Sequence, residues 1–86
     1  YVLRLFISGD RLAAQGTLEN IHRLLEQGLG HAYTLKVIDI TRNPELAETD
    51  QVSATPTLVR VWPQPVRRIV GHLDDLPRVL RILTAL

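Results

Sequence analysis

Residues 53–68 read Ser53-Ala54-Thr55-Pro56-Thr57-Leu58-Val59-Arg60-Val61-Trp62-Pro63-Gln64-Pro65-Val66-Arg67-Arg68. A Thr-Pro step leads into a β-branched run, and two further prolines then precede an arginine pair. The composition predicts a strand from Thr57 to Val61, a turn at Pro63-Gln64-Pro65 and a second strand from Val66 to Val70. Each X–Pro bond can adopt the cis form at a cost of about 0.5–1 kcal/mol, so several conformations are open to this stretch.

The N-terminal half predicts a βαβ unit. Residues Tyr1 to Ser8 and Tyr33 to Ile40 mix β-branched and aromatic side chains, which is typical of strands. Between them, apolar residues recur at helical spacing from Leu12 to Gln27, and Gly28 and Gly30 are expected to end that helix. Two strands that flank one helix pair in parallel through a crossover connection.

Two further helices are predicted in the C-terminal half. Asn43 is a candidate N-cap with Pro44 at the first helical position of a short helix that ends near Asp50. Asp74 and Asp75 precede a final helix that has Pro77 in its first turn. The apolar residues of this helix fall on one face: Leu76, Val79, Leu80, Leu83 and Leu86. The order βαβαββα predicts an α/β, thioredoxin-like fold that forms one domain over residues 1–86.

The composition indicates a small folded domain. The chain has 86 residues, is 45% hydrophobic, carries a net charge of +1 and contains no cysteine. The lack of cysteine excludes disulfides, thiolate metal sites and Cys-x-x-Cys redox chemistry. No apolar run approaches the roughly 18–20 residues that span a bilayer. We therefore expect a cytoplasmic protein that does not bind membranes.

The candidate catalytic and metal-binding residues form no recognisable set. His22, His31 and His72 lack carboxylate partners at the spacing of metal ligands. Ser8 and Ser53 lack the glycine-framed elbow of a nucleophile. We therefore expect no catalytic residues, no metal and no cofactor, and favour a binding domain over an enzyme.

Basic residues cluster near one edge of the predicted sheet. Arg60, Arg67, Arg68 and Lys36 predict a basic patch there. The few aromatic residues are not interleaved with these basic ones as they are in RNA-binding sheets, so nucleic acid is not the expected ligand. A basic patch of this kind suits a charged protein surface better.

Four segments together resemble the KaiB family of bacterial circadian-clock proteins. They are Leu35-Lys36-Val37-Ile38-Asp39-Ile40, Asn43-Pro44-Glu45-Leu46-Ala47-Glu48, Ala54-Thr55-Pro56-Thr57-Leu58 and Pro65-Val66-Arg67-Arg68-Ile69-Val70-Gly71. The resemblance runs from Tyr1 to Leu86 and implies no catalysis. It implies binding to the N-terminal ATPase ring of a KaiC-like kinase and regulation of its phosphorylation state, with KaiA as a further candidate partner. Gln64 and Trp62 depart from the family pattern of three prolines after a smaller aliphatic residue, which indicates a divergent paralogue.

The resemblance also implies two alternative folds. One is a monomeric, thioredoxin-like state that binds KaiC, and the other is a βαββααβ homotetramer whose C-terminal segment is a strand. The pairs Val79-Leu80 and Ile82-Leu83 suit a helix and spoil the alternation of a half-buried strand, and Pro77 would remove a ladder hydrogen bond. We therefore expect the thioredoxin-like, fold-switched state and a monomer.

The family match also implies roles for individual residues. It places Lys36, Ala54, Thr55, Arg67 and Arg68 at or near a partner-binding surface, and it implies that Pro56, Pro63 and Pro65 govern the choice between the two folds. Two alternatives remain open from the sequence. One is the KaiB-like sensor domain of a SasA-type clock histidine kinase. The other is a thioredoxin-like enzyme without a catalytic thiol of its own, such as a transferase domain that needs a bound thiol cofactor, for which glutathione is the ligand to test.

Overall fold

The computed structural model describes residues 1–9, 12, 14–71 and 73–85. Within these ranges the elements follow the predicted order: β1 (Val2–Ile7), α1 (Gln15–Leu24), β2 (Thr34–Asp39), α2 (Pro44–Thr49), β3 (Thr57–Trp62), β4 (Arg67–Val70) and α3 (Leu76–Leu83). A π-helical turn, η1 (Leu25–Leu29), extends α1. The C-terminal segment is thus a helix, as the pairing of its apolar residues predicts, and the alternative βαββααβ arrangement is not the one observed.

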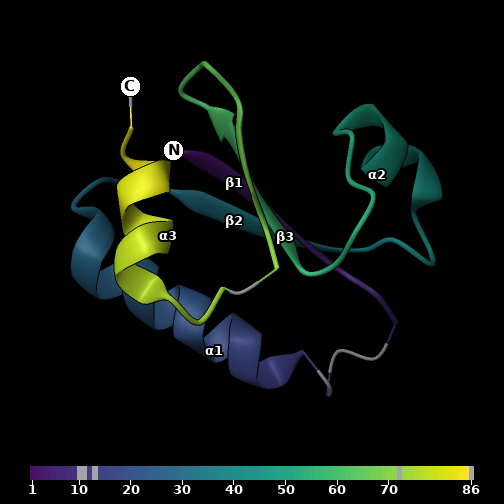
Figure 1. Cartoon of the computed structure of the whole chain (residues 1–86), viewed down its shortest axis with the longest axis horizontal. Helices are drawn as coiled ribbons and strands as arrows, with labels where there is room; N and C mark the ends of the chain where they lie inside the picture. The colour runs from purple at the N-terminus through teal and green to yellow at the C-terminus, as the bar shows by residue number, and fades with distance from the viewer. Residues whose placement is uncertain (10–11, 13, 72, 86) are drawn as a thin grey trace.

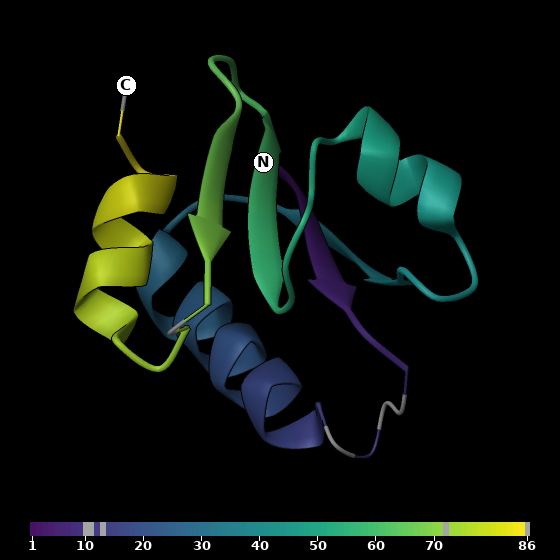
Figure 2. The same ribbon diagram turned by 45° about the vertical axis from the view of Figure 1, so that its right-hand side comes forward.

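The strands form one mixed sheet in the order β2-β1-β3-β4. β1 and β2 are parallel, as the βαβ unit requires, whereas β3 lies antiparallel to both β1 and β4. β2 and β4 are therefore the two edges. Figure 1 shows α3 on one side of this sheet and α2 on the other, and Figure 2 shows the β3–β4 hairpin beside α3.

Two hydrophobic clusters cover the two faces of the sheet. The larger one packs α1 and α3 against the strands, and its buried members include Leu5, Ile21, Leu58, Val79 and Leu83. The smaller one packs α2 on the opposite face and consists of Phe6, Ile38, Ala47 and Val59. Because side chains alternate along a strand, Leu5 and Phe6 serve different clusters although they are neighbours in the chain.

The first helix differs from its prediction at both ends. It begins at Gln15 rather than at Leu12, and it passes through Gly28 to end at Leu29. Gly28 was therefore wrongly expected to stop the helix. Gly30 is the residue that ends it, since its φ of +72° is a left-handed conformation that side chains with a Cβ rarely adopt.

The starts of the other two helices were predicted at the right positions. Asn43 occupies the N-cap position of α2, but its side chain makes no capping hydrogen bond there. Its amide instead donates to the main-chain oxygen of Asp39 at 3.3 Å. In α3, the Asp75 carboxylate accepts a hydrogen bond from the Arg78 amide at 3.3 Å, which satisfies one of the free N–H groups of the first turn.

The prolines of residues 53–68 lie before and after β3. The peptide bonds that precede Pro56, Pro63 and Pro65 are all cis. Pro56 precedes β3, and its carbonyl accepts from the Gly71 amide at 2.9 Å, whereas Pro63 and Pro65 lie in the turn between β3 and β4. None of the described helices is long and apolar enough to cross a membrane.

Candidate functional site

A row of basic side chains crosses the sheet on the face that carries α2. Lys36 of β2 pairs in register with Arg4 of β1, Arg4 pairs with Val59 of β3, and Val59 pairs with Arg68 of β4. Register partners on neighbouring strands point to the same face, and Val59 belongs to the cluster under α2. We name Lys36, Arg4 and Arg68 the basic row. Arg4 was not among the predicted site residues, because only the register of β1 reveals its neighbours.

Two members of the basic row hold the end of α2. Arg4 Nη1 lies 2.7 Å from Asp50 Oδ2, and the two side chains are only 30% and 13% exposed. Arg68 Nε donates to the main-chain oxygen of Asp50 at 2.8 Å. A cation at the C-terminal end of a helix is favourable because the last carbonyls carry the negative end of the helix dipole. The predicted site residue Arg68 therefore already has a structural contact.

Lys36 is the member of the basic row whose charge is most accessible to a binding partner. Its side chain is exposed on the edge strand β2, and it makes no ion pair within the part of the chain that the structure describes. Ala54 and Thr55 lie in the loop that leaves α2 and leads into β3. The Thr57 hydroxyl donates to the Ala54 carbonyl at 2.7 Å, which fixes this loop against the start of β3.

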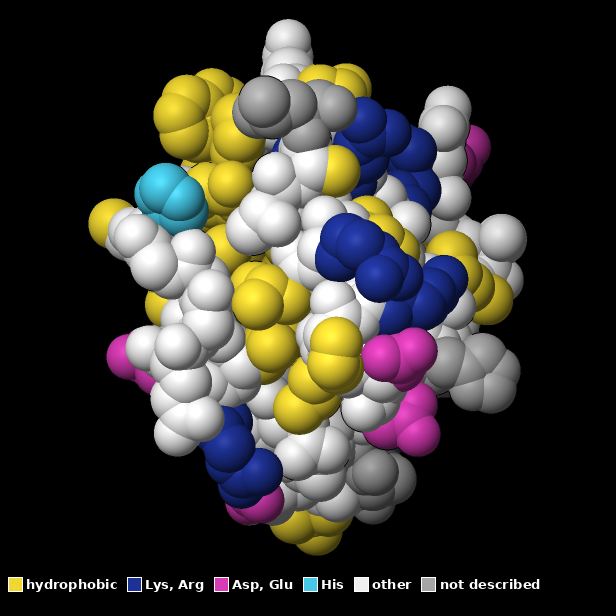
Figure 3. Space-filling view, turned by 60° about the vertical axis from the view of Figure 1, so that its left-hand side comes forward, with side chains coloured by type: hydrophobic (Ala, Val, Ile, Leu, Met, Phe, Trp, Pro, Cys, Tyr) yellow, Lys and Arg dark blue, Asp and Glu magenta, His cyan; other side chains and the backbone are white. Residues whose placement is uncertain are grey.

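The arginine pair is divided between the two faces of the sheet. Arg68 pairs with Val59 on the α2 face, whereas Arg67 pairs with Arg60 and shares the α3 face with Ile69. The expectation that both arginines belong to one patch was therefore wrong. Neighbouring residues of a strand point to opposite faces of the sheet, so Arg67 and Arg68 are separated. Arg78 and Arg81 of α3 are also basic, and Figure 3 shows basic side chains gathered on the side of the molecule that α3 occupies.

Arg60 was also wrongly placed in an accessible patch. Its residue is 1% exposed, and its guanidinium donates to main-chain carbonyls rather than facing solvent. Of the predicted basic patch, only Lys36 and Arg68 therefore share one accessible face.

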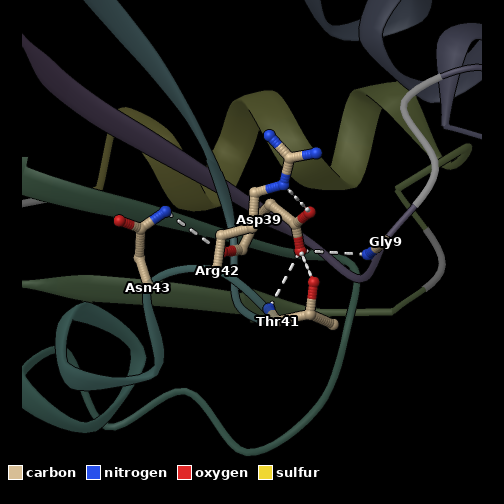
Figure 4. Close-up of polar contacts among 5 residues, drawn as sticks. All are labelled: Gly9, Asp39, Thr41, Arg42 and Asn43. Carbon is tan, nitrogen blue, oxygen red and sulfur yellow. Dashed lines mark hydrogen bonds and ion pairs between the residues drawn. The ribbon is translucent and has the colours of Figure 1, made fainter.

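A polar hollow lies at the end of the parallel strands β1 and β2, beside the loop that leads from β2 to α2. Its lining includes Gly9, Asp39, Thr41, Arg42 and Asn43, and its volume is about 490 Å³. Figure 4 shows Asp39 at the centre of the polar contacts among these residues. Asp39 Oδ1 accepts from the Gly9 amide at 3.0 Å, from the Thr41 amide at 2.9 Å and from the Thr41 hydroxyl at 2.7 Å.

These hydrogen bonds lower the pKa of Asp39 from its ordinary value, with the Thr41 hydroxyl as the largest cause and the Gly9 and Thr41 amides next. Arg42 Nε, 3.9 Å from Asp39 Oδ2, adds a weaker attraction. The carboxylate thereby fastens the loop after β1 to the end of β2. The Asp39-Ile40-Thr41 spacing, which is typical of a side-chain turn, could have indicated this role.

No metal-binding group is formed among the described residues, since no three His, Asp or Glu side chains come together there. His72 lies outside the described residues. Tyr1 and His31 stack with ring centroids 5.2 Å apart, which gives His31 a packing contact near the N-terminus.

Comparisons with known proteins identify the family. A model of the KaiB domain matches residues 4–85 of this chain. The chain belongs to the KaiB family. A circadian clock oscillator protein KaiB from Prochlorococcus marinus (strain MIT 9211) is 46% identical over 80 residues, which cover 93% of this chain and 70% of that protein. The KaiB of Nostoc sp. (strain PCC 7120) is also 46% identical, with 93% of this chain and 74% of that protein covered.

Solved structures support the fold. The N-terminal domain of SasA from Synechococcus elongatus superposes with a TM-score of 0.76 at 23% identity, covering 93% of this chain and 75% of that one. A malarial protein superposes with a TM-score of 0.71 at 17% identity, covering 98% of this chain and 97% of that one. At these identities the likeness shows the shared fold alone. The KaiB assignment therefore depends on the sequence matches, and the thioredoxin-like arrangement agrees with the fold that the resemblance predicts.

Proposed function

We propose that this protein is a non-enzymatic, clock-type regulator that binds the N-terminal ATPase ring of a KaiC-like kinase and thereby regulates its phosphorylation state. The observation that carries the proposal is the KaiB match over residues 4–85, together with relatives named as circadian clock oscillator proteins. The helical C-terminal segment supports it, because the family resemblance associates the thioredoxin-like state with KaiC binding. The proposal locates the protein in the cytoplasm, and it requires no metal or cofactor.

The proposed contact surface is the α2 face of the sheet. Lys36 and Arg68 supply positive charge there, and Ala54 and Thr55 lie in the adjoining loop. These charges suit an acidic surface on the partner, because complementary charges speed association and favour the correct partner. Arg67 points to the other face, so we propose that it acts only where the partner also reaches the α3 side.

Binding to a purified KaiC-like hexamer tests this surface. We expect an ATP-dependent complex whose dissociation constant rises about tenfold in Lys36→Glu, because the substitution reverses a charge at the interface. Arg23→Glu is the matched control, since Arg23 is exposed on α1, on the opposite side of the sheet. Absence of any complex contradicts the function, whereas equal binding by both variants contradicts only the surface. Adding KaiA to the preformed complex tests the further partner.

We also propose that the protein exchanges between this fold and a tetrameric one, with Pro56, Pro63 and Pro65 governing the preference. The three prolines flank β3, so they lie where the second half of the chain would have to rearrange. Size-exclusion chromatography with NMR assignment of residues 74–85 tests this proposal. We expect a monomer with a helical C-terminal segment as the main species, and slow exchange with a minor one. A tetramer with a C-terminal strand as the main species contradicts the preference.

A second candidate is the sensor domain of a SasA-type clock histidine kinase. The superposition on the SasA N-terminal domain, with its TM-score of 0.76, favours it. The 46% identity to KaiB proteins, against 23% to the SasA domain, supports the first proposal. The full reading frame decides between them, because a kinase core must follow the domain in the second case.

A further inference from the structure

Arg60 is a buried cation that joins two distant segments of the chain. It lies in β3 and is 1% exposed. Its Nη1 donates to the carbonyl of Leu83, the last residue of α3, at 2.9 Å and also to the carbonyl of Ala85, two residues beyond the helix. Its Nη2 donates to the Pro65 carbonyl at 2.7 Å, in the turn between β3 and β4. One guanidinium therefore holds the helix end and the turn together.

The chemistry of these contacts makes them interdependent. All three acceptors are neutral carbonyls, and Arg60 has no carboxylate partner among the described residues. A buried charge is costly unless it is hydrogen-bonded, and each hydrogen bond that it loses adds to that cost. If the turn moves away, the guanidinium loses the acceptor of its Nη2. If the end of α3 moves away, it loses two.

Each segment can move only at a cost to the other. The Arg60 Nε is already buried without a hydrogen bond among the described residues. Loss of a further hydrogen bond would therefore leave a second donor of the same guanidinium unsatisfied. The last carbonyls of a helix lack partners within the helix, and a cation there also benefits from the helix dipole. Loss of the turn contact therefore favours release of α3, and fraying of α3 favours release of the turn.

The turn is open to contact from outside. Trp62 is 58% exposed and Val66 is 39% exposed, and Gln64 between them is also exposed. These residues flank Pro63 and Pro65, so a molecule that contacts the turn reaches the segment whose carbonyl Arg60 holds. Figure 2 shows the turn near the end of α3, as these hydrogen bonds require.

We propose that Arg60 is a latch that couples the β3–β4 turn to α3, so that a contact at the exposed turn alters the opening of the C-terminal helix. The coupling depends only on this chain and goes beyond the proposed binding to a KaiC-like partner. Its essential feature is that the turn and the helix end open together, as one unit separate from β1 and β2.

Amide hydrogen exchange in the native state, measured by NMR on the wild-type chain, is the first test. We expect the amides of β4 and of the last turn of α3 to share one opening equilibrium with the same urea dependence, distinct from that of β1 and β2. Different opening equilibria for β4 and α3, or one equilibrium shared by all strands and helices, would overturn the proposal.

Arg60→Lys and Arg60→Met are the test variants. Arg81→Lys is the control, because Arg81 is an exposed arginine of α3, the helix that Arg60 contacts. A lysine ammonium lacks the planar fork that reaches two segments at once. We expect exchange in α3 and β4 to accelerate at least about tenfold in Arg60→Lys, with β1 and β2 unchanged. A uniform acceleration, or none, overturns the latch. If Arg60→Met does not fold, the lysine variant and the wild-type measurement still decide.

Discussion

Arg4 and Asp50 form an ion pair that joins the middle of the sheet to the end of α2. Arg4 Nη1 and Asp50 Oδ2 lie 2.7 Å apart, and both side chains are largely shielded from solvent. Arg68 reaches the main chain of the same residue. Asp50 therefore connects two strands of the basic row to the helix that covers the smaller hydrophobic cluster.

Removal of the Arg4 cation should release the end of α2. We expect Arg4→Met to lower the free energy of unfolding by about 1–2 kcal/mol, because a partly buried carboxylate loses its charged hydrogen-bond donor. Urea unfolding followed by circular dichroism measures this loss, and a double-mutant cycle with Asp50→Asn isolates the coupling. Arg42→Ala is the control, with an expected effect below about 0.5 kcal/mol, since Arg42 Nε lies 3.9 Å from Asp39 Oδ2 and the Arg42 side chain is 85% exposed. Equal effects of the two substitutions would contradict the assigned role.

Asp39 should make the stability depend on pH in the acid range. Its pKa is lowered from an ordinary value of 3.8, so the folded state favours the carboxylate. This contribution to stability is complete above the unfolded-state pKa and is lost as the pH falls through the lower, folded-state pKa. We expect the wild type to lose stability between about pH 5 and pH 2 more steeply than Asp39→Asn does. Thermal unfolding across this range checks the slope, and parallel curves for the two proteins would contradict the prediction.

Gly28 lies in η1, next to Leu80 of α3. A Cβ on Gly28 would lie 3.1 Å from Leu80 Cδ2, closer than ordinary packing allows. We expect Gly28→Val to destabilise the fold by about 1–3 kcal/mol, because the branched side chain pushes on Leu80. Gly16→Ala is the matched control, since nothing lies within 4 Å of its Cβ position. That substitution should stabilise α1 by about 0.5 kcal/mol through helix propensity. Thermal melts compare the two, and a stabilising Gly28→Val would disprove the close contact.

Asp75 should be the acidic residue that caps α3. Its carboxylate accepts from the Arg78 amide, whereas the neighbouring Asp74 makes its helix-start contact through its main-chain oxygen, to Leu76. We expect Asp75→Ala to cost about 1 kcal/mol, the usual value for a lost N-cap. Asp74→Ala should cost less than about 0.5 kcal/mol, as is usual for an exposed side chain without such a role. Chemical denaturation of the two variants measures the difference, and the reverse ranking would show that Asp74 is the cap.

The helices and strands were predictable because their signals are local. Apolar spacing marks α1 and α3, β-branched runs mark the strands, and Pro44 with Asn43 marks the start of α2. The errors lie at the ends of elements, where one residue has competing options. Gly28 could stop a helix but lies inside a π-helical turn, and Asn43 could cap α2 but donates to Asp39 instead.

The candidate site was predictable only in part. Lys36 and Arg68 were identified, but the strand period separates Arg67 from Arg68, and the buried position of Arg60 removes it from the surface. Arg4 was missed because its role depends on register with β2 and β3, which no single segment encodes. Register is set by the packing of a whole strand face, so neighbours across the sheet emerge only when the strands assemble.

The chain itself determined the order of its elements and the helical form of its C-terminal segment, since both follow from the spacing of apolar residues and from proline positions. Assembly in three dimensions decided which groups the charged side chains contact. Arg60 is buried and donates to the Leu83 carbonyl of α3, and Arg4 forms an ion pair with Asp50. The physical reason is the distance along the chain over which each effect acts. Periodicity acts over one helical turn or one strand, whereas a long cationic side chain responds to whichever acceptors the fold brings within reach.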